Sequence, residues 1–189
     1  MQKTYQKKFT VAKKKSKLSG CYFINLNKNI DHRGYFFNVL SEKLFFNKFP
    51  SKSIKQINLS ENKNKGTLRG LHFQAKPFSE SKIVMCLKGR IFDVVLDLRK
   101  HSKTFGQHIS FELGEKKSQL VYIPKNCAHG YQTLEENCIV MYLHFGDYVK
   151  THDFCINAID DRLKIKWPIK NKIMSKRDIN AKSLNDYVL

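Results

Sequence analysis

The feature that most constrains this fold is a series of short apolar runs, each of strand length, that follow one another along the chain. The runs are rich in β-branched and aromatic residues, and turn formers such as Gly89 and Asn126 separate them. No helical segments of ten residues, which a parallel sheet would need between its strands, interrupt the series. The pattern predicts a mainly β protein, a sandwich or jelly-roll β-barrel with a few short helices. The runs are 21–26, 34–40, 53–60, 82–89, 90–98, 108–113, 119–124 and 138–145.

The length of 189 residues fits one domain with a sizeable core. Residues 1–18 are polar, rich in lysine and without periodicity, which indicates a flexible or edge-strand N-terminal arm. Residues 19–189 are predicted to form the single jelly-roll domain. Within this domain one helix is expected over 41–49. The segment after Pro168 loses the strand pattern, and we expect it to pack against the barrel as loops and a short helix.

The expected location is the cytoplasm. No apolar run of seven or more residues follows the basic N-terminus, so a cleavable secretory signal is not predicted, and no stretch is long enough to span a membrane. The odd number of cysteines and the lack of CxxC spacing argue against both a disulfide framework and a zinc site. The five cysteines are Cys21, Cys86, Cys127, Cys138 and Cys155.

The net charge of +19 at pH 7 requires a choice between a nucleic-acid partner and a solvated basic surface. Lysines dominate the charge, and they are scattered along the chain without a motif that reads DNA or RNA. An anionic small substrate accounts for the charge equally well, and so does the composition of an A+T-rich genome. We therefore expect no nucleic-acid partner. Affinity for DNA or RNA that falls steeply with salt would indicate nonspecific charge attraction.

The first segment that could carry chemistry is 58–74, which ends in a predicted strand containing Arg69 and His72. Their spacing of three would place the two side chains on opposite faces of a regular strand. A distortion at Gly70 would bring both to one face. A purely structural role for His72, hydrogen-bonded inside the barrel, is the alternative.

Two later segments also carry candidate residues. In 122–132, we expect His129 in a turn that enters a strand, where it would bind a phosphate or support its neighbours. A metal site needs three or more converging ligands, and position 74, two residues after His72, is glutamine, so no metal is predicted. In 138–149, Tyr142 shares a strand face with His144, and Tyr148 follows a Gly-Asp turn. Taken alone, Tyr142 would be a packed aromatic residue with a satisfied hydroxyl.

These segments, taken together, resemble the dTDP-4-dehydrorhamnose 3,5-epimerase family, a dimeric, metal-independent branch of the cupin jelly rolls. The order and spacing of many short motifs carry the resemblance, which a single motif would not. The motifs are DHRGYFF (31–37), QINLSENKNKGTLRGLHFQ (56–74), SKIVMCLKGRIFDVVLDLR (81–99), TFG (104–106), YIPKNCAHGY (122–131), VMY (140–142) and IKWP (165–168).

The resemblance implies a cofactor-independent isomerase for bacterial surface-polysaccharide synthesis. Its substrate would be a 4-keto-6-deoxy sugar nucleotide such as dTDP-4-dehydro-6-deoxyglucose, inverted at carbons 3 and 5. Each inversion needs a base, a stabilised enolate and an acid on the opposite face. By motif position, His72 matches the family's base, Asp178 the carboxylate that orients it, and Tyr142 the acid. Lys82 is the candidate for enolate stabilisation.

The resemblance also implies a substrate-binding shell. Its members would be Arg33, Gln56, Asn58, Arg69, His129 and Tyr148. In the family, Arg33 can come from a strand exchanged with the partner subunit, so a homodimer is expected. Structural roles compete with these assignments, since Gln56 and Asn58 could satisfy buried backbone groups and Tyr148 could be rim packing.

Several alternatives stay open at this point. Asn38 stands where the family motif usually ends in an acid, so the nucleotide is uncertain, and GDP-linked 6-deoxy-4-keto hexoses or heptoses are candidates. Inversion at carbon 3 alone is another possibility. A non-catalytic cupin that binds sugar nucleotides would not need the histidine, aspartate and tyrosine set. A metal-dependent cupin enzyme would be inhibited by chelators.

Overall fold

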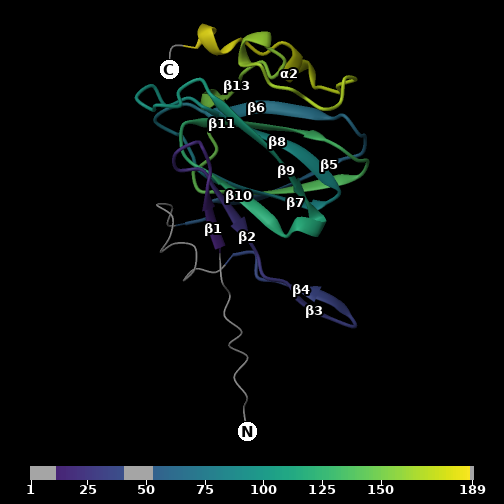
Figure 1. Ribbon diagram of the computed structural model, residues 1–189. Helices are drawn as coiled ribbons and strands as arrows, with labels where there is room; N and C mark the ends of the chain where they lie inside the picture. The colour runs from purple at the N-terminus through teal and green to yellow at the C-terminus, as the bar shows by residue number, and fades with distance from the viewer. Residues whose placement is uncertain (1–11, 41–52, 188–189) are drawn as a thin grey trace.

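The computed structural model describes residues 12–40 and 53–187. Two antiparallel sheets pack face to face, and a separate two-stranded hairpin projects away from them (Figure 1). The sheets form a jelly-roll sandwich that does not close into one continuous barrel. The mainly β prediction is confirmed, while the helix predicted over 41–49 lies outside the described residues. In the parts of the chain that the structure describes, no helix is long and apolar enough to cross a membrane.

The strand order is not the chain order in either sheet. The six-stranded sheet contains, in order, β1 (Ala12–Lys15), β2 (Tyr22–Asn25), β10 (Gln119–Ile123), β7 (Lys82–Lys88), β12 (Cys138–His144) and β5 (Gln56–Asn62). The five-stranded sheet contains β13 (Asp153–Cys155), β6 (Leu68–Gln74), β11 (Cys127–Thr133), β8 (Arg90–Asp97) and β9 (His108–Gly114). The hairpin pairs β3 (Asn29–Asp31) with β4 (Gly34–Phe36).

The core between the two sheets follows from the two-residue period of the strands. On β8, Ile91 and Val95 pack into the cluster between the sheets, whereas Val94 and Leu96 pack on the outer face. β8 is therefore buried on both faces, and it appears in the sequence as a nearly continuous apolar run. Interior positions that are polar, such as Asp93, stand out against this pattern.

The C-terminal segment buries the outer face of the five-stranded sheet. Trp167 packs edge-on against Phe92 with ring centroids 5.7 Å apart, and Tyr187 packs against Phe73 at the same separation. The segment contains loops, 3₁₀ turns and one short helix, α2 (Lys176–Ile179), as the loss of periodicity after residue 168 predicts. The 3₁₀ turns of the described residues are η1 (Glu115–Lys117), η2 (Lys150–His152), η3 (Asp161–Leu163) and η4 (Leu184–Asp186).

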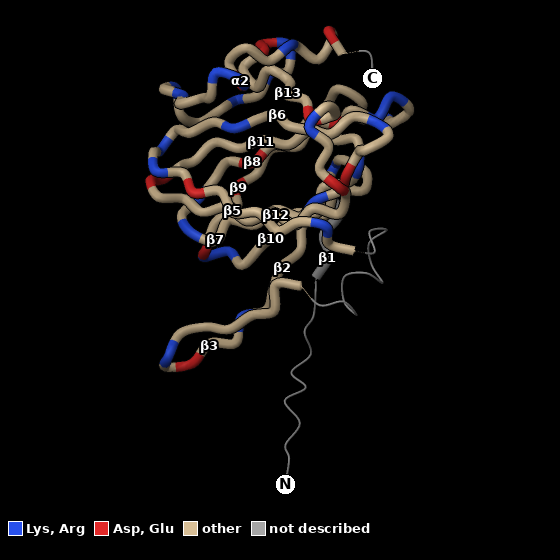
Figure 2. The backbone as a smooth tube through the Cα atoms, turned by 180° about the vertical axis from the view of Figure 1, so that it is seen from behind, with Lys and Arg blue, Asp and Glu red and all other residues tan. Residues whose placement is uncertain are grey.

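The hairpin of β3 and β4 makes a sheet only with itself and leaves large apolar side chains exposed, among them Ile30 and Phe36. Figure 2, which shows the molecule from behind, has the hairpin extending away from the two packed sheets. An isolated two-stranded hairpin is marginally stable in water. The edge strand β5 also exposes Ile57 and Leu59 on its outer face. In a single chain, the apolar side chains on these two surfaces therefore remain exposed to water.

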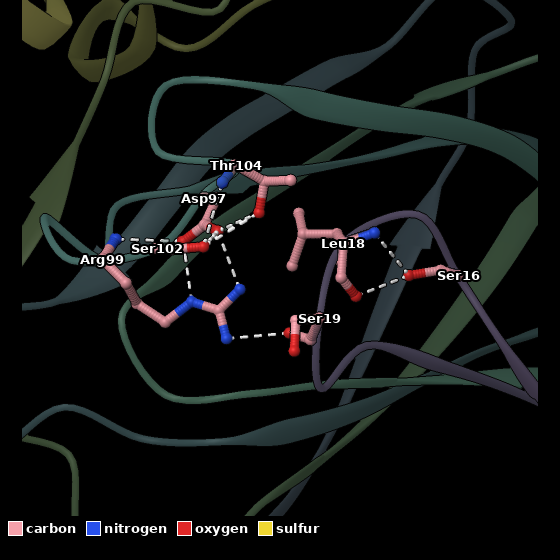
Figure 3. A network of polar contacts seen from close by, with 7 residues as sticks. All are labelled: Ser16, Leu18, Ser19, Asp97, Arg99, Ser102 and Thr104. Carbon is pink, nitrogen blue, oxygen red and sulfur yellow. Dashed lines mark hydrogen bonds and ion pairs between the residues drawn. The ribbon is translucent and has the colours of Figure 1, made fainter.

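A network around Asp97 fixes the loop between β8 and β9 (Figure 3). The Asp97 side chain is completely buried, and Arg99 donates to both of its oxygens from Nε and Nη2 at 2.7 Å. Ser102 and Thr104 each donate a hydroxyl hydrogen bond to the same carboxylate at 2.6 Å. Burial alone would raise the pKa of Asp97, but these hydrogen bonds outweigh it and lower the pKa to about 2.

We expect Asp97→Asn to destabilise the fold by about 3 kcal/mol at neutral pH, because it leaves the Arg99 guanidinium without its buried anion. A carboxyl with a lowered pKa stabilises the fold above its ordinary pKa of 3.8 and loses that contribution as the pH falls towards about 2. The difference in urea unfolding between wild type and variant should therefore shrink over this acidic window.

The matched control for this prediction is Asp160→Asn. Arg162 donates to Asp160 through the same three groups, its backbone amide, Nε and Nη2, but at the surface. Exposed pairs contribute about 0–1 kcal/mol, so this variant should unfold close to wild type. Equal losses in both variants would show that burial of the Asp97 network does not stabilise the fold.

Candidate functional site

A polar cavity of about 380 Å³ opens between the two sheets. The two-residue period that packs the core also builds this site, because alternate residues of each strand face the interior. From the six-stranded sheet, β5, β7 and β12 contribute interior polar residues, and from the five-stranded sheet β6 and β11 do so. The main polar residues that line it are Gln56, Asn58, Ser60, Arg69, His72, Gln74, Glu80, Lys82, His129, Tyr131, Tyr142, His144, Tyr148, Asp153 and Arg177.

A bulge in β6 brings Arg69 and His72 to the same face. The register between β6 and β11 shifts between the pairs His72–His129 and Arg69–Tyr131, and Gly70 there adopts a φ of 114°. A Cβ atom on Gly70 would lie 2.7 Å from the Cα of the residue opposite, so only glycine fits. The distortion predicted at Gly70 is confirmed, and both side chains line the cavity.

His72 and Asp178 form a hydrogen-bonded pair. The Nε2 atom of His72 lies 2.7 Å from Oδ1 of Asp178. Asp178 lies on α2, within the C-terminal segment, and is 3% exposed. Burial works against ionisation of Asp178, but the hydrogen bond and charge of His72, with hydrogen bonds from Cys155 and Ser175, lower its pKa. Asp178 is therefore an anion at neutral pH. It fixes the imidazole and leaves the second ring nitrogen free to accept a proton.

Tyr142 lies on β12, in the sheet that faces the one carrying His72. Its ring packs against His129 and His144, with centroids 6.1 and 5.9 Å away. Burial is the main reason that its pKa is raised well above 10, and Tyr131 and the charge of Asp93 raise it further, while Arg69 acts in the opposite direction. Tyr142 therefore keeps its proton at neutral pH and can donate it. A molecule held between the sheets would have His72 on one sheet and Tyr142 on the other.

Lys82 is a buried cation with a buried partner. Its Nζ lies 3.3 Å from Oε1 of Glu80, and His144 Nδ1 lies 2.9 Å from the other oxygen of Glu80. Burial opposes ionisation of Glu80, but His144 and Lys82 together lower its pKa. Sequence reasoning missed Glu80. The available signal was its spacing of two from Lys82, which places both side chains on one side of an extended chain.

His129 lies in the middle of β11, so its predicted position in a turn is wrong. β11 begins at Cys127, directly after the turn, and all of its residues are buried. The strand has therefore already started two residues before His129. The imidazole Nε2 lies 2.9 Å from Oδ2 of Asp93. Burial raises the pKa of Asp93 although His129 opposes this. Sequence reasoning also missed Asp93, whose signal was a carboxylate inside an apolar run.

Arg69 and Tyr148 are both exposed residues that line the cavity. Arg69 donates from Nε to Asn62 at 2.7 Å, which fixes its guanidinium. Tyr148 lies at the rim, with its hydroxyl donating to Oδ2 of Asp153 at 3.2 Å. Arg177 binds the same carboxylate oxygen at 2.9 Å and adds a cation that the sequence reading did not select.

The structure does not bring Arg33 to this cavity within one chain. Arg33 lies in the turn between β3 and β4, where its side chain is 78% exposed and pairs with Asp31 at 2.6 Å. Gln56 and Asn58, by contrast, line the cavity from the edge strand β5. Their side chains are exposed in the single chain, which does not support the alternative that they satisfy buried backbone groups.

His72, Cys155 and Asp178 form the one group in the described ranges whose potential metal-ligating atoms lie close together, within 4.8 Å of one another. The imidazole and carboxylate in this group are in direct hydrogen-bonding contact. A tetrahedral zinc would need its nitrogen and oxygen ligands about 3.3 Å apart. The imidazole and the carboxylate are closer than that, at a distance at which they share a proton. Burial also raises the pKa of the Cys155 thiol, which keeps it neutral.

The fold and the cavity define a jelly-roll protein whose two sheets enclose a polar cavity, with a histidine–aspartate pair at one sheet and a tyrosine on the other. The family model for dTDP-4-dehydrorhamnose 3,5-epimerase matches residues 15–186. The chain belongs to this family, and it is an isomerase of the nucleotide-sugar epimerase type.

Individual relatives agree with this assignment. A dTDP-4-dehydrorhamnose 3,5-epimerase of Sinorhizobium fredii is 36% identical over 155 residues, which cover 82% of this chain and 80% of that protein. The crystal structure of a Bacillus anthracis dTDP-4-dehydrorhamnose 3,5-epimerase with TDP and PPi bound has a TM-score of 0.88 and 31% identity, covering 92% of this chain and 99% of that one. A Streptomyces bikiniensis 3'-monoepimerase in complex with dTDP-quinovose has a TM-score of 0.85 and 26% identity, covering 90% and 86%.

Proposed function

We propose that this chain inverts carbons 3 and 5 of a dTDP-linked 4-keto-6-deoxy hexose. The observation that carries the proposal is the pair of His72 and Asp178 on one side of a cavity whose other side holds a protonated Tyr142. The proposed nucleotide follows from the relatives, since solved structures similar to this chain hold TDP or a dTDP-sugar.

In the proposed reaction, the free ring nitrogen of His72 removes the proton from the carbon beside the ketone. The electron pair of the broken C–H bond moves into the carbonyl and forms an enolate. Asp178 stabilises the imidazolium that results, because it is a buried anion in direct contact with the ring.

Lys82 is the proposed stabiliser of the enolate oxygen. It lies in the cavity as a buried cation, and Glu80 holds it in place. Removing one such donor typically costs about a hundredfold or more in rate. Tyr142 then gives its proton to the carbon from the opposite side, which inverts the centre. Proton return from imidazolium to tyrosinate through solvent restores both groups.

The proposed binding shell uses the cations and amides that surround the reacting groups. Arg69 and Arg177 offer positive charge to the diphosphate, and Gln56 and Asn58 offer hydrogen bonds from β5. His129 supports the sugar from the cavity wall, and Tyr148 at the rim presents a ring to the nucleotide base.

We also propose a homodimer in which the hairpin of one subunit completes the cavity of the other. The exposed apolar residues of the hairpin, the exposed face of β5 and the distant position of Arg33 support this arrangement. In such a dimer, Arg33 of one chain would supply a further cation to the substrate of its partner.

Mixing two inactive variants tests the shared site. We expect Arg33→Ala and His72→Ala each to be impaired when alone. Refolding them together should restore about a quarter of the wild-type activity. Half of the resulting dimers are mixed, and each mixed dimer has one intact site out of two. Turnover of the mixture measures this restoration. No restoration, despite mixed dimers seen by native mass spectrometry, would contradict the shared site.

We place the reaction in the cytoplasm. All five cysteines are free and buried, which fits a reducing compartment.

Proton NMR in deuterium oxide tests the proposed function. With dTDP-4-keto-6-deoxyglucose we expect loss of the proton signals at carbons 3 and 5. The relative that is a 3'-monoepimerase makes exchange at carbon 3 alone the second candidate. Exchange only with GDP-linked sugars would show that the substrate carries GDP and not dTDP. No exchange with any sugar nucleotide would favour a binding protein without catalysis.

A further inference from the structure

A second cavity lies outside the catalytic one. Its volume is about 800 Å³, against 380 Å³ for the catalytic cavity. The loop after β8, the turn between β1 and β2, and the start of the loop after β6 surround it. Pockets of about 300–1,000 Å³ are of the size that binds small molecules. The mechanism proposed above uses none of the residues that lie only in this second cavity.

The lining of the second cavity is cationic. Among the described residues that line it, the charged ones are all basic, namely Lys17, Lys76, Arg99, Lys100 and Lys103, with His101 beside them, and none is a carboxylate. Arg99 is neutralised by the buried Asp97. Within residues 12–40 and 53–187, the four lysines form no ion pair with the protein. Four lysines therefore line one hollow, and none of them is neutralised by a described residue of the protein.

The floor of the second cavity is apolar. Phe73, Ala75 and Leu98 contribute to it, and Phe73 and Leu98 are themselves part of the core on the outer face of the five-stranded sheet. A cationic rim above an apolar floor suits a ligand that has an anionic group at one end and an aromatic or apolar group at the other. Lysine binds phosphate as a point charge, so phosphate groups fit the rim.

The rim is held in place before any ligand arrives. Hydrogen bonds from Arg99, Ser102 and Thr104 to Asp97 fix the loop that carries Lys100 and Lys103 (Figure 3). Arg99 also donates from Nη1 to the backbone carbonyl of Ser19 at 2.8 Å, which ties this loop to the turn between β1 and β2. Such order lowers the entropy cost of binding.

We propose that the second cavity binds a phosphorylated small molecule of nucleotide size, separately from the substrate. The lysines at residues 76, 100 and 103 bind its phosphates, and the floor of Phe73 and Leu98 receives its base. The cavity adjoins the catalytic one, because Phe73 and Gln74 of β6 line both. A ligand there contacts the strand that carries His72, which gives it a direct structural route to the catalytic base.

Calorimetric titration of the full chain with dTDP tests the proposal. The test variant is Lys100→Glu/Lys103→Glu, and the matched control is Lys116→Glu/Lys117→Glu, which changes the charge equally at η1, at the opposite end of β8. We expect two dTDP molecules per wild-type chain, one catalytic and one in the second cavity. The test variant should bind its second molecule more than about tenfold more weakly, whereas the control should bind both.

The number of sites lost between wild type and test variant decides the outcome. A loss of one site, with unchanged thermal unfolding and turnover, supports the second cavity even if the catalytic cavity proves not to bind dTDP. Equal stoichiometry and affinity in wild type and test variant would overturn the proposal. Equal losses in the test and control variants would also overturn it, because they would show general charge attraction.

Discussion

Replacement of His72 by alanine should abolish proton exchange at both sugar carbons while the protein stays folded and still binds nucleotide. The imidazole is the only group hydrogen-bonded to Asp178 that also lines the catalytic cavity among the described residues. General-base catalysis contributes about 10²- to 10⁴-fold, so residual exchange should fall by at least that factor. Deuterium incorporation followed by NMR measures it directly.

The control for this prediction is His108→Ala, because His108 lies on β9 and does not line the catalytic cavity. It should exchange both protons at the wild-type rate. The exchange rate of Asp178→Asn should lie between those of His72→Ala and His108→Ala. In this variant the His72 ring keeps a hydrogen-bonding partner but loses the anion that stabilises its charged form. Exchange near the wild-type rate in His72→Ala would refute the assignment of the base.

In Tyr142→Phe, solvent deuterium should still enter the substrate, but inverted product should fall by about a hundredfold or more. The variant keeps the packing of the aromatic ring and removes only the proton that the mechanism delivers from the second sheet. Because the pKa of Tyr142 is raised well above 10, loss of its proton should not limit wild-type inversion at ordinary alkaline pH. Exchange and inversion measured in the same NMR sample give the two rates.

Tyr131→Phe is the matched control for the acid. Tyr131 lines the same cavity, but its hydroxyl lies within hydrogen-bonding distance of Ser60 and Asn62, both at 3.2 Å, and the proposed mechanism does not use it as an acid. This variant removes one influence that raises the pKa of Tyr142, but burial remains the main one, so Tyr142 keeps its proton and the ratio of exchange to inversion at neutral pH should stay at the wild-type value. If Tyr142→Phe lost exchange and inversion equally, Tyr142 would not be the acid that acts after proton removal.

The sequence was sufficient for the fold class because the strand period repeats along most of the chain. It also predicted the distortion that brings Arg69 and His72 together, since Gly70 lies between two residues with incompatible spacing. The order of the strands could not be derived in this way, because neighbours such as β7 and β12 are far apart in the chain. Alternation determines the face of a residue, and it does not determine the neighbour of a strand.

The partners of the site residues were the part that local patterns could not supply. Asp178 reaches His72 across 106 positions, and only the family motif connected them. The histidines that pair with Glu80 and Asp93 come from other strands, His144 from β12 and His129 from β11, and local patterns do not show which strands are neighbours. Arg33 shows the same limit in another form, because a cavity completed by a second chain has no local signature in the first.

The position of Asp178 gives catalysis a dependence on the last part of the chain. This carboxylate lies in the segment that covers the outer face of the five-stranded sheet, so the base is fully formed only while that cover is docked. Local opening of a cover requires less free energy than unfolding of the sheets beneath it. Activity should therefore disappear at lower urea concentrations than strand structure does, which makes turnover a sensor of the closed cover.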